Sequence, residues 1–436
     1  MQRAYAKELS GLSGKKAEVQ GWVHEIRDIG GLKFIVLKDK TGFMQLTLPK
    51  KAVSPAVFEK AASLTKESIV SASGLVKNSP QAQNGVELIP DELEIVSLAK
   101  APVPIDMSGK INSDLSVRLD YRFLDLRNPK SIALFRIRSK VSKFIAEFFD
   151  YQGFMNINTP KLTVAGVESG AELFPVVYFD RQAFLSQSPQ IYKQMMVAAG
   201  FEKVYELGVV FRAEKSNTTR HLTEFTGVDF EQGFIESEHD AMDTAEGLMK
   251  HIIKRLTEEC PEELKLWGRE LKPADYKFPR MTMKEVKEIL AKKGKILPPE
   301  DDLDPEAEKM LGEIVKEKFG SEFVFVTEYP WSKRPFYHMK PEGKSNLTKS
   351  FDLIWNGVEI ATGAQREHRY EILKAQAKEK GLNLDEMKDY AMIFQYGCPP
   401  HGGAGLGLDR MIECLMKLDN IREGILLPRD PVRLTP

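Results

Sequence analysis

The chain has 436 residues, of which 42% are hydrophobic and 29% charged, and its formal net charge is −1. These values are typical of a globular protein of two or three domains, so any nucleic-acid partner must be bound by a local patch. Its three cysteines are widely spaced, no apolar run approaches the ~20 residues that cross a bilayer, and the N-terminus lacks a secretory segment. We therefore expect a cytoplasmic protein with no membrane partner.

Residues 17–48 contain three runs of alternating apolar and polar side chains, separated by the turn sequences DIGG and DKTG. Alternation with period two predicts β-strands. A helical stretch near 55–67 follows, and then two more strand-like runs at 68–77 and 85–96. Short strands with one interposed helix predict a five-stranded barrel of the oligonucleotide-binding (OB) kind over residues 1–104.

The prolines of KAPVPIDMSG, residues 100–109, predict a linker or hinge, which we place at 105–130. Apolar residues at helical spacing over 131–152 then predict a long helix. Strand candidates follow between 172 and 235 and again from 323 onward, on either side of a helix-rich segment at about 240–320 that we expect to be peripheral. This order predicts an α+β fold over 131–436, built on an antiparallel sheet with flanking helices.

The segment FRAEKSNTTRHLTEF, residues 211–225, gathers opposite charges inside the chain. On a strand, Arg212 and Glu214 would point to the same face, where a simple ion pair is one interpretation. KSNTTRH is typical of a turn between antiparallel strands, which would bring His221 back beside Arg212. Because the arginine fork matches phosphate oxygens and Phe225 offers a stacking face, a nucleotide site is the other interpretation.

Two further segments carry chemistry, GLGLDR at 405–410 and FDLIWNGVEIATGAQREHR at 351–369. A glycine-rich strand leading into a helix N-terminus favours anions, although a plain strand-to-helix turn has the same pattern. Arg410 in the first helical turn opposes the helix dipole, which indicates another role. Asp352, Glu359 and the hydroxyl of Thr362 fit a hard cation such as Mg²⁺, or alternatively a solvated strand end.

These three segments resemble motifs 2 and 3 of the class II aminoacyl-tRNA synthetases, and GFMNINTPKL at 153–162 resembles motif 1. LFPVVYFDRQAFLSQSPQIYKQ at 173–194 narrows the resemblance to aspartyl-tRNA synthetases of the archaeal/eukaryotic type, in subclass b. The resemblance covers essentially the whole chain. It implies an enzyme that uses ATP to activate L-aspartate as aspartyl-adenylate and transfers it to the 3′ end of tRNA(Asp). It also implies a homodimer through the motif 1 region near Pro160.

The resemblance assigns the ATP and metal sites. Arg212 and Arg410 are implied to be catalytic, on the α-phosphate and the far phosphates respectively. Glu359 and Thr362 are implied to bind Mg²⁺, with threonine where serine is commoner in the family. The implied ATP-binding set is Arg212, Ala213, Glu214, Arg220, His221, Leu222, Phe225, Glu359, Gly407, Leu408, Asp409 and Arg410.

The resemblance also assigns an aspartate pocket in which Glu168 faces the amino group. Gln190, Lys193 and Arg366 are implied to surround the side-chain carboxylate. Two cations match aspartate, whereas asparagine would leave desolvated positive charge uncompensated. The related asparaginyl enzymes lack a lysine at the place of Lys193. The implied set is Glu168, Gln190, Ile191, Tyr192, Lys193, Arg212, Thr362 and Arg366.

In the barrel, Phe34 and Gln45 fall on neighbouring strands, where a buried Phe and a solvated Gln is the plain interpretation. The resemblance implies instead that Phe34 stacks on an anticodon base and Gln45 reads it, with Arg27 nearby. For tRNA discrimination, His24 is typical of relatives that also charge tRNA(Asn). Gln83 matches neither the relaxed nor the restrictive residue at its position, so charging of tRNA(Asn) stays open.

Three alternative functions stay beside this prediction. An asparaginyl or lysyl synthetase is disfavoured by Lys193 and Arg366, and an asparagine synthetase-like ligase using an aspartyl-adenylate is disfavoured by the barrel. A non-catalytic RNA-binding paralogue would be expected to lose Arg212, Glu359 or Arg410, and the sequence contains all three.

Overall fold

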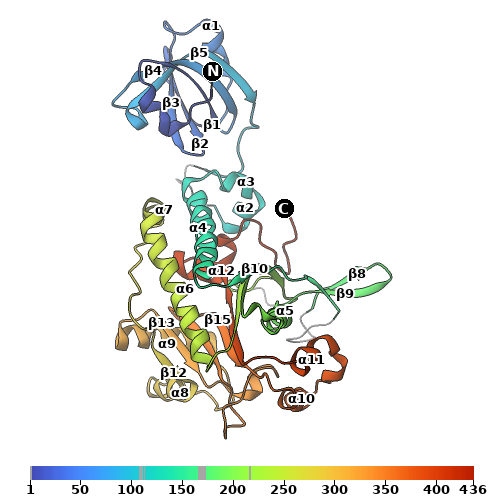
Figure 1. The fold of residues 1–436 in the computed structure, drawn as a ribbon. Coiled ribbons are helices and arrows are strands. Elements are labelled where there is room, and N and C mark those ends of the chain that lie inside the picture. The colour runs from blue at the N-terminus through green and yellow to red at the C-terminus, as the bar shows by residue number, and fades with distance from the viewer. Residues whose placement is uncertain (1, 108–110, 112, 165–172, 216–217) are drawn as a thin grey trace. The chain divides into compact units, whose positions relative to one another are not determined.

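A computed structural model describes residues 2–107, 111, 113–164, 173–215 and 218–436. The chain divides into two compact units, Met1–Asn128 and Pro129–Pro436, which are drawn in Figure 1. Within the described residues, no helix has both the length and the apolar character needed to span a membrane.

The first unit contains a closed barrel, formed within the described residues by five strands in the order β1-β2-β3-β5-β4. Helix α1 (Pro55–Ala62) connects β3 to β4, and the Ser54 side chain caps it by accepting from the Val57 N–H. Alternate residues such as Val19, Ile35 and Leu46 are fully buried inside the barrel. The predicted five-stranded OB fold is therefore confirmed. The strands are β1 (Lys16–Asp28), β2 (Leu32–Asp39), β3 (Gly42–Pro49), β4 (Ile69–Asn78) and β5 (Val86–Ser97).

The segment predicted as a linker contains two short helices, α2 (Leu115–Asp120) and α3 (Arg122–Asp125). The Nη1 atom of Arg127 donates to the Oε2 atom of Glu67 at 2.9 Å. This ion pair joins the segment to the barrel, and the first compact unit accordingly extends to Asn128.

The second unit is built on a mixed sheet that contains, among the described residues, eight strands in the order β12-β13-β14-β15-β16-β11-β10-β6. Every neighbouring pair from β13 to β10 is antiparallel, as predicted, whereas the edge strands β12 and β6 pair in parallel. The expected α+β class is confirmed. The strands are β6 (Met155–Asn156), β10 (Lys203–Phe211), β11 (Glu224–Gly233), β12 (Arg280–Thr282), β13 (Phe323–Thr327), β14 (Ser350–Trp355), β15 (Val358–Arg366) and β16 (His401–Gly407).

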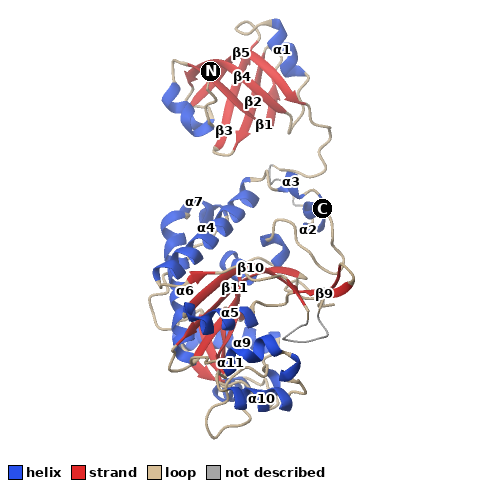
Figure 2. Cartoon of the chain, turned by 45° about the vertical axis from the view of Figure 1, so that its right-hand side comes forward, coloured by secondary structure: helices blue, strands red, loops and turns tan. Residues whose placement is uncertain are grey.

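Helices α4 (Pro129–Tyr151), α6 (Glu238–Glu259) and α12 (Leu408–Met416) pack on one face of this sheet. Figure 2 shows α4 and α6 side by side along it. The long helix predicted over 131–152 is thus present. The prediction that 240–320 is peripheral is wrong for α6, because its apolar stripe, including Met242, Met249 and Ile252, is buried in the main core. Most Lys and Glu residues of this segment lie on the solvent side of α6, and their number made the whole segment look solvent-exposed in the sequence.

The remaining elements surround the sheet. Helices α8 and α9 form a smaller core against β13 and β14. A separate three-stranded sheet, in the order β7-β9-β8 among the described residues, follows the motif 1 segment. These elements are β7 (Leu162–Thr163), β8 (Pro175–Tyr178), β9 (Arg181–Leu185), α5 (Gln190–Met196), α7 (Pro261–Leu266), α8 (Met283–Lys292), α9 (Pro305–Phe319), α10 (Tyr370–Glu379) and α11 (Lys388–Gln395).

Strand alternation gives the two faces of the main sheet different chemistry. On β11, Val228 and Phe230 belong to the helix-covered core, whereas Asp229 and Glu231 point to the opposite face. The paired strands β15 and β16 continue this division: Leu406 faces the core, and Thr362 lies opposite Gly405 on the other face. The face without core helices therefore carries the polar residues.

Candidate active site

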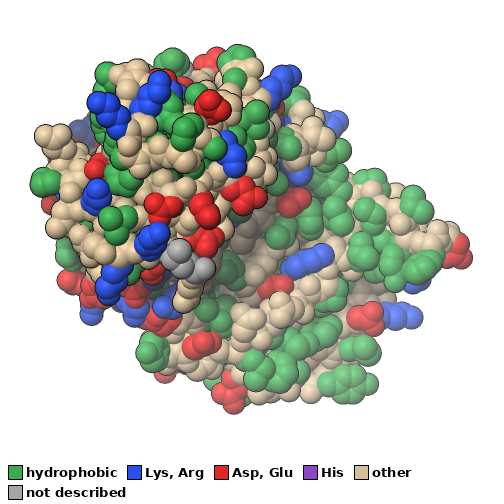
Figure 3. Space-filling model, turned by 90° about the horizontal axis from the view of Figure 1, so that it is seen from above, with side chains coloured by type: hydrophobic (Ala, Val, Ile, Leu, Met, Phe, Trp, Pro, Cys, Tyr) green, Lys and Arg blue, Asp and Glu red, His purple; other side chains and the backbone are tan. Residues whose placement is uncertain are grey.

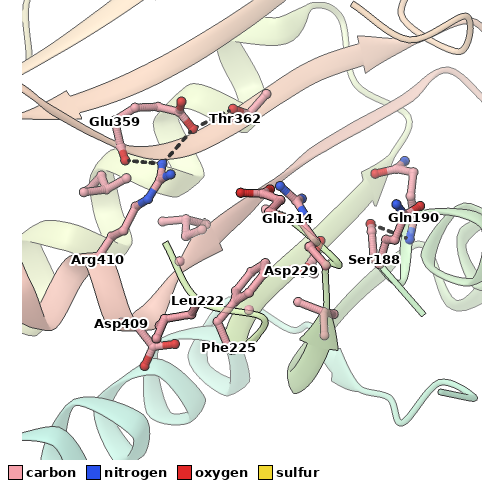
Figure 4. A pocket seen from close by; sticks show the side chains of 18 of the residues that line it. Ser188, Gln190, Glu214, Leu222, Phe225, Asp229, Glu359, Thr362, Asp409 and Arg410 are labelled. Atoms are coloured by element: carbon pink, nitrogen blue, oxygen red, sulfur yellow. Dashed lines mark hydrogen bonds and ion pairs between the residues drawn. The ribbon is translucent and has the colours of Figure 1, made fainter. Parts of the chain in front are cut away.

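A cavity of about 390 Å³ opens on this polar face. Its walls come from α5, β10, β11, β15, β16, the start of α12, and the chain that follows β13. Figure 4 shows several of its side chains, among them Glu214, Phe225, Glu359 and Arg410. The predicted site residues that line it are Gln190, Lys193, Arg212, Glu214, Arg220, His221, Leu222, Phe225, Glu359, Thr362, Arg366, Gly407, Asp409 and Arg410.

Other predicted residues do not line the cavity. Ile191 packs against an apolar cluster on the α10–α11 side, and Leu408 is buried in the main core. Tyr192 and Ala213 are half-buried outside the lining. Glu168 lies outside the described residues.

The segment 211–225 forms two arms that return on each other, as predicted. Phe211 lies opposite Glu224 in the antiparallel pair β10–β11, and the Arg212 N–H donates to the Thr223 carbonyl at 3.0 Å. The predicted turn includes residues 216 and 217, which are outside the described set. His221 Nε2 lies 3.6 Å from Glu214 Oε2, so the two arms also meet through side chains.

One detail of this prediction is wrong: β10 ends at Phe211, so Arg212 and Glu214 are in a loop and not on a strand. The Arg212 guanidinium instead lies over the Phe225 ring, 5.3 Å from its centre. The arginine is therefore presented beside an aromatic face, an arrangement suited to a nucleotide.

The strand-to-helix turn at 405–410 places Arg410 against β15. Arg410 Nη1 donates to the Glu359 carbonyl at 3.0 Å and lies 3.5 Å from Glu359 Oε1. Thr362 Oγ1 donates to the same carboxylate oxygen at 3.1 Å. These contacts, dashed in Figure 4, join the predicted phosphate anchor to the predicted metal ligands.

Asp352 adds a second carboxylate beside Glu359. Its Oδ2 atom accepts from Arg334 Nη2 at 2.6 Å, while its Oδ1 atom is buried and has no partner among the described residues. Burial, and then the charge of Asp352, raise the pKa of Glu359. Two neighbouring carboxylates, one of them buried with an unused oxygen, fit a hard cation. Among the described residues, no group of three or more His, Cys, Asp or Glu side chains is arranged to hold a metal ion.

The two pocket cations, Lys193 and Arg366, are buried and already paired. Lys193 Nζ donates to Asp229 Oδ1 at 3.0 Å and to the Ala404 carbonyl at 3.3 Å, and it lies 3.4 Å from Glu231 Oε2. Arg366 Nε donates to Glu231 Oε1 at 2.9 Å. Burial raises the pKa of Glu231, but Arg366 and Lys193 outweigh it and hold that pKa below its ordinary value.

Aspartate selectivity was predicted from Lys193 and Arg366 as two cations without buried counter-charges. That prediction was incomplete, because Asp229 and Glu231 already neutralise both cations. The alternation in TGVDFEQG could have placed both carboxylates on one face of β11. Glycines on β16 make room for them: a Cβ at Gly403 would lie 2.6 Å from Glu231 Oε2, and one at Gly405 would lie 3.0 Å from Asp229 Oδ1.

The barrel brings Arg27 and Phe34 directly opposite each other on β1 and β2. Phe34 is half-buried on the outer face, since the interior positions of β2 are Ile35 and Leu37, so it is not a core residue. Gln45, on the neighbouring strand β3, donates through Nε2 to Thr47 at 3.1 Å and to Glu87 at 3.2 Å.

His24 lies at a bulge in β1, with its ring centre 4.8 Å from that of Phe43. Burial lowers the pKa of His24. Gln83 is exposed at the start of a single turn, Gln83–Gly85, and its neighbour Asn84 donates to the Phe43 carbonyl at 2.7 Å. His24 and the chain neighbour of Gln83 therefore both contact Phe43.

Comparison with known proteins agrees with this geometry. Residues 114–431 match the family described as tRNA synthetases class II (D, K and N), and residues 17–96 match the OB-fold nucleic acid binding domain. The chain is 47% identical to an aspartate–tRNA(Asp) ligase of Pyrococcus abyssi, over 99% of each chain. It is also 47% identical to an aspartate–tRNA(Asp/Asn) ligase of Methanopyrus kandleri, over 97% of this chain and 96% of that one.

Among solved structures, the asparaginyl-tRNA synthetase of Pyrococcus horikoshii complexed with asparaginyl-adenylate has a TM-score of 0.94 at 33% identity, and the match covers all of both chains. The fold therefore does not separate the two amino-acid specificities, whereas the full-length sequence identity does. The chain belongs to the class II tRNA synthetases of the Asp, Lys and Asn group and, within that group, to the aspartate–tRNA ligase family of archaea.

Proposed function

We propose that this protein activates L-aspartate with ATP to form aspartyl-adenylate and then transfers the aspartyl group to the 3′ end of tRNA(Asp). The observation that carries this proposal is the single cavity wall on which the paired cations Lys193 and Arg366, the loop arginine Arg212 and the Glu359–Arg410 contact meet. One end of the cavity is thereby suited to a small amino acid and the other to a polyphosphate.

The reaction needs no side-chain base. The α-carboxylate of aspartate attacks the α-phosphorus of ATP, the bond to the bridging oxygen breaks, and pyrophosphate leaves with that electron pair. Arg212 and Arg410 stabilise the charge that develops on the phosphate oxygens. The terminal hydroxyl of the tRNA then attacks the adenylate carbonyl, the bond from that carbonyl carbon to the phosphate oxygen breaks, and AMP leaves while its phosphate takes up the hydroxyl proton.

Glu359 and Thr362 would hold Mg²⁺, and Asp352, whose Oδ1 atom is buried and unused among the described residues, lies opposite Thr362 in the β14–β15 pair. When bound there, the ion supplies positive charge to phosphate oxygens. Arg334 fixes Asp352, and Arg410 fixes Glu359, so both carboxylates are oriented before a ligand arrives.

We propose that the barrel, within residues 1–104, recognises the anticodon through Arg27, Phe34 and Gln45. Phe34 offers a ring on the outer face of β2, and Gln45 offers an amide one strand away. Stacking combined with hydrogen bonds to base edges is the usual readout of single-stranded RNA.

Whether tRNA(Asn) is also charged depends on His24 and Gln83. Relatives named for tRNA(Asp) alone and relatives named for both tRNAs are equally similar to this chain, so overall identity favours neither. Because His24 contacts Phe43, one substitution at either residue is expected to change whether tRNA(Asn) is charged.

A homodimer through the motif 1 region near Pro160 completes the proposal. Large apolar side chains are exposed there, with Met155 50%, Val177 92% and Phe179 86% exposed. Figure 3 shows hydrophobic side chains gathered on the projecting β8–β9 hairpin at the right. Such a patch favours a protein partner, and a second copy is the simplest one. Sedimentation or light scattering of the purified protein tests whether this dimer forms. A cytoplasmic location stays a prediction.

The deciding experiment is aspartate-dependent exchange of labelled pyrophosphate into ATP, followed by charging of purified tRNA(Asp) and tRNA(Asn). We expect exchange with aspartate and not with asparagine, and loss of that selectivity in Lys193→Ala. Exchange supported by asparagine would favour an asparaginyl synthetase instead. A Lys193→Ala variant with full aspartate selectivity would contradict the assignment of the pocket.

A further inference from the structure

His338 is a buried residue of the cavity wall that belongs to none of the sequence motifs. It follows β13 in the segment RPFYH, is 2% exposed, and lines the cavity with Lys193 and Arg366. Its backbone is fixed, because its carbonyl accepts from Gln376 Nε2 at 3.1 Å and its segment bridges to Arg366.

One contact determines the tautomer of the His338 ring. Its Nε2 atom lies 2.9 Å from Nη1 of Arg366, and a guanidinium can only donate hydrogen bonds. Nε2 must therefore accept, which leaves the proton of the neutral ring on Nδ1. Burial, with the charges of Arg366, Arg334 and Lys193, lowers the pKa of His338, in agreement with a neutral ring.

The Nδ1–H group is a donor without an acceptor. The atom is buried and has no hydrogen-bond partner within the described part of the chain. An unsatisfied buried donor destabilises a protein unless a ligand supplies the missing acceptor. Because His338 lines the cavity together with Arg366, a ligand with acceptor oxygens bound at this end of the cavity could supply the missing acceptor.

The neighbouring cations have few donors left for such a ligand. The three N–H groups of Lys193 face Asp229, Glu231 and the Ala404 carbonyl. Arg366 donates twice to Glu231, once to the Gly403 carbonyl and once to His338, which leaves one Nη1–H free of partners among the described residues.

We propose that His338 is a specificity-determining residue whose Nδ1–H donates to the side-chain carboxylate of aspartate beside Arg366. This role rests on the proposed aspartate activation. A carboxylate offers acceptors to both the His338 and Arg366 donors, whereas the amide of asparagine offers one acceptor and presents N–H groups to the other donor. His338 thereby restores the discrimination that Asp229 and Glu231 remove by neutralising the two cations.

Two variants separate the two nitrogens of the ring. In His338→Gln, the amide oxygen is placed to accept from Arg366 as Nε2 does, and the Nδ1–H is lost. In His338→Asn, the amide nitrogen lies near the Nδ1 position and keeps a donor, while the acceptor for Arg366 is lost. Both are assayed by pyrophosphate exchange with aspartate, asparagine and ATP varied in turn.

We expect His338→Gln to raise the KM for aspartate about tenfold or more, the usual effect of losing a hydrogen bond to a charged group. Its aspartate-to-asparagine preference in kcat/KM should fall by a similar factor, with the KM for ATP within about twofold. His338→Asn should recover part of this loss. Wild-type values in His338→Gln, or equal impairment of both variants, would overturn the role of His338.

A spectroscopic measurement covers the case in which the variants do not fold. The chain has seven histidines, so ¹⁵N-histidine labelling of the wild-type protein gives few ring signals. We expect a neutral Nδ1–H ring whose signal moves on adding aspartate and not asparagine. If every non-titrating ring is an Nε2–H tautomer, or no such signal responds to aspartate, the inference fails. If the wild-type protein shows no aspartate-dependent exchange, the proposed function fails instead.

Discussion

The barrel and the catalytic unit each contain an arginine–carboxylate pair at the proposed site, in opposite environments. Arg27 lies 3.1 Å from Glu25 with its side chain 66% exposed, whereas Arg366 lies 2.9 Å from Glu231 with 3% exposed. Water competes for the first pair, so Arg27 can exchange its partner for RNA at little cost. The second pair is desolvated, and breaking it leaves a buried charge.

The difference indicates how the two units work. The outer face of the barrel presents side chains that are free to rearrange around a flexible RNA loop. The catalytic wall holds its charges in fixed positions before substrate arrives, which is the arrangement that stabilises a transition state. Changes in the barrel should therefore affect tRNA charging alone, while changes in the wall should affect both amino-acid activation and stability.

Arg366→Ala is the most direct test of the proposal that the catalytic wall depends on fixed, desolvated charges. We expect aspartate-dependent pyrophosphate exchange to fall by about 10³-fold or more, since positioning and charge are both lost. We also expect the free energy of unfolding to fall by about 3–5 kcal/mol, because Glu231 loses its main partner. Urea titration and exchange assays measure both effects.

Lys374→Ala is the control for this variant, because Lys374 pairs with Asp385 at 3.0 Å and the two side chains are 45% and 61% exposed. It should change neither quantity much. Exchange by Arg366→Ala within tenfold of wild type would contradict the fixed-charge account of the wall.

Phe34→Ala tests the other half of the comparison. Stacking contributes about 1–3 kcal/mol per base, so charging of tRNA(Asp) should fall by about tenfold to hundredfold. Exchange without tRNA should stay within about twofold. Tyr5→Ala, a half-buried aromatic of the same unit beneath Arg3 and Lys40, serves as control. Equal loss of charging and exchange in Phe34→Ala would refute the division of labour.

Glu413→Gln measures how much a desolvated carboxylate of the catalytic unit lowers the free energy of unfolding when it is charged. Burial raises the pKa of Glu413 from 4.5 to about 6. A folded-state pKa above the unfolded value means that this group favours folding at low pH and that its contribution is lost as pH rises through that range. The free energy of unfolding should therefore fall by up to about 2 kcal/mol between pH 4.5 and about 6 because of this group.

Glu413→Gln removes the ionisable group, so the variant should not show this decrease in the free energy of unfolding between pH 4.5 and about 6. The stability difference between Glu413→Gln and wild type should grow with pH up to about pH 6 and stay constant above it, as urea titrations at several pH values will measure. Glu258→Gln, the same substitution at a side chain that is 53% exposed, is the surface control. A difference that is independent of pH would contradict the assignment.

Arg27→Ala should have the smallest effect, a few-fold rise in the KM for tRNA(Asp) that diminishes as salt is raised. Lys16→Ala removes another exposed cation of the barrel, paired with Asp91 at 2.7 Å, and should leave that KM nearly unchanged. If the two variants raised the KM equally, Arg27 would act through general charge and not at a defined position.

Periodicity predicted the barrel and the long helix α4, and the resemblance of the motifs to a known family assigned most of the cavity wall, because each depends on local sequence. Alternation places Ile35 inside the barrel and Phe34 outside once the strand is identified. The motif residues Arg212, Glu359 and Arg410 converge because the order of the strands brings their segments together.

The features that could not be predicted depend on long-range pairing. Nothing local in EQG or RPFYH indicates that Glu231 neutralises Arg366, or that His338 accepts from it across 28 positions of sequence. The strand β10 was expected to reach Glu214, since alternation continues to that residue, but pairing ends at Phe211. Similarly, the burial of α6 follows from its contact with α4, which is distant in sequence.

The glycines of β16 have a consequence for redesigning the amino-acid pocket. A Cβ at Gly403 would lie 2.0 Å from the carbonyl oxygen of Phe230, so main chain, and not a movable side chain, sets that boundary. A side chain at position 403 would therefore require the main chain of β11 to move. Laboratory evolution toward a bulkier amino acid is expected to change the segment that carries Arg334 and His338, which lines the cavity, and to leave Gly403 unchanged.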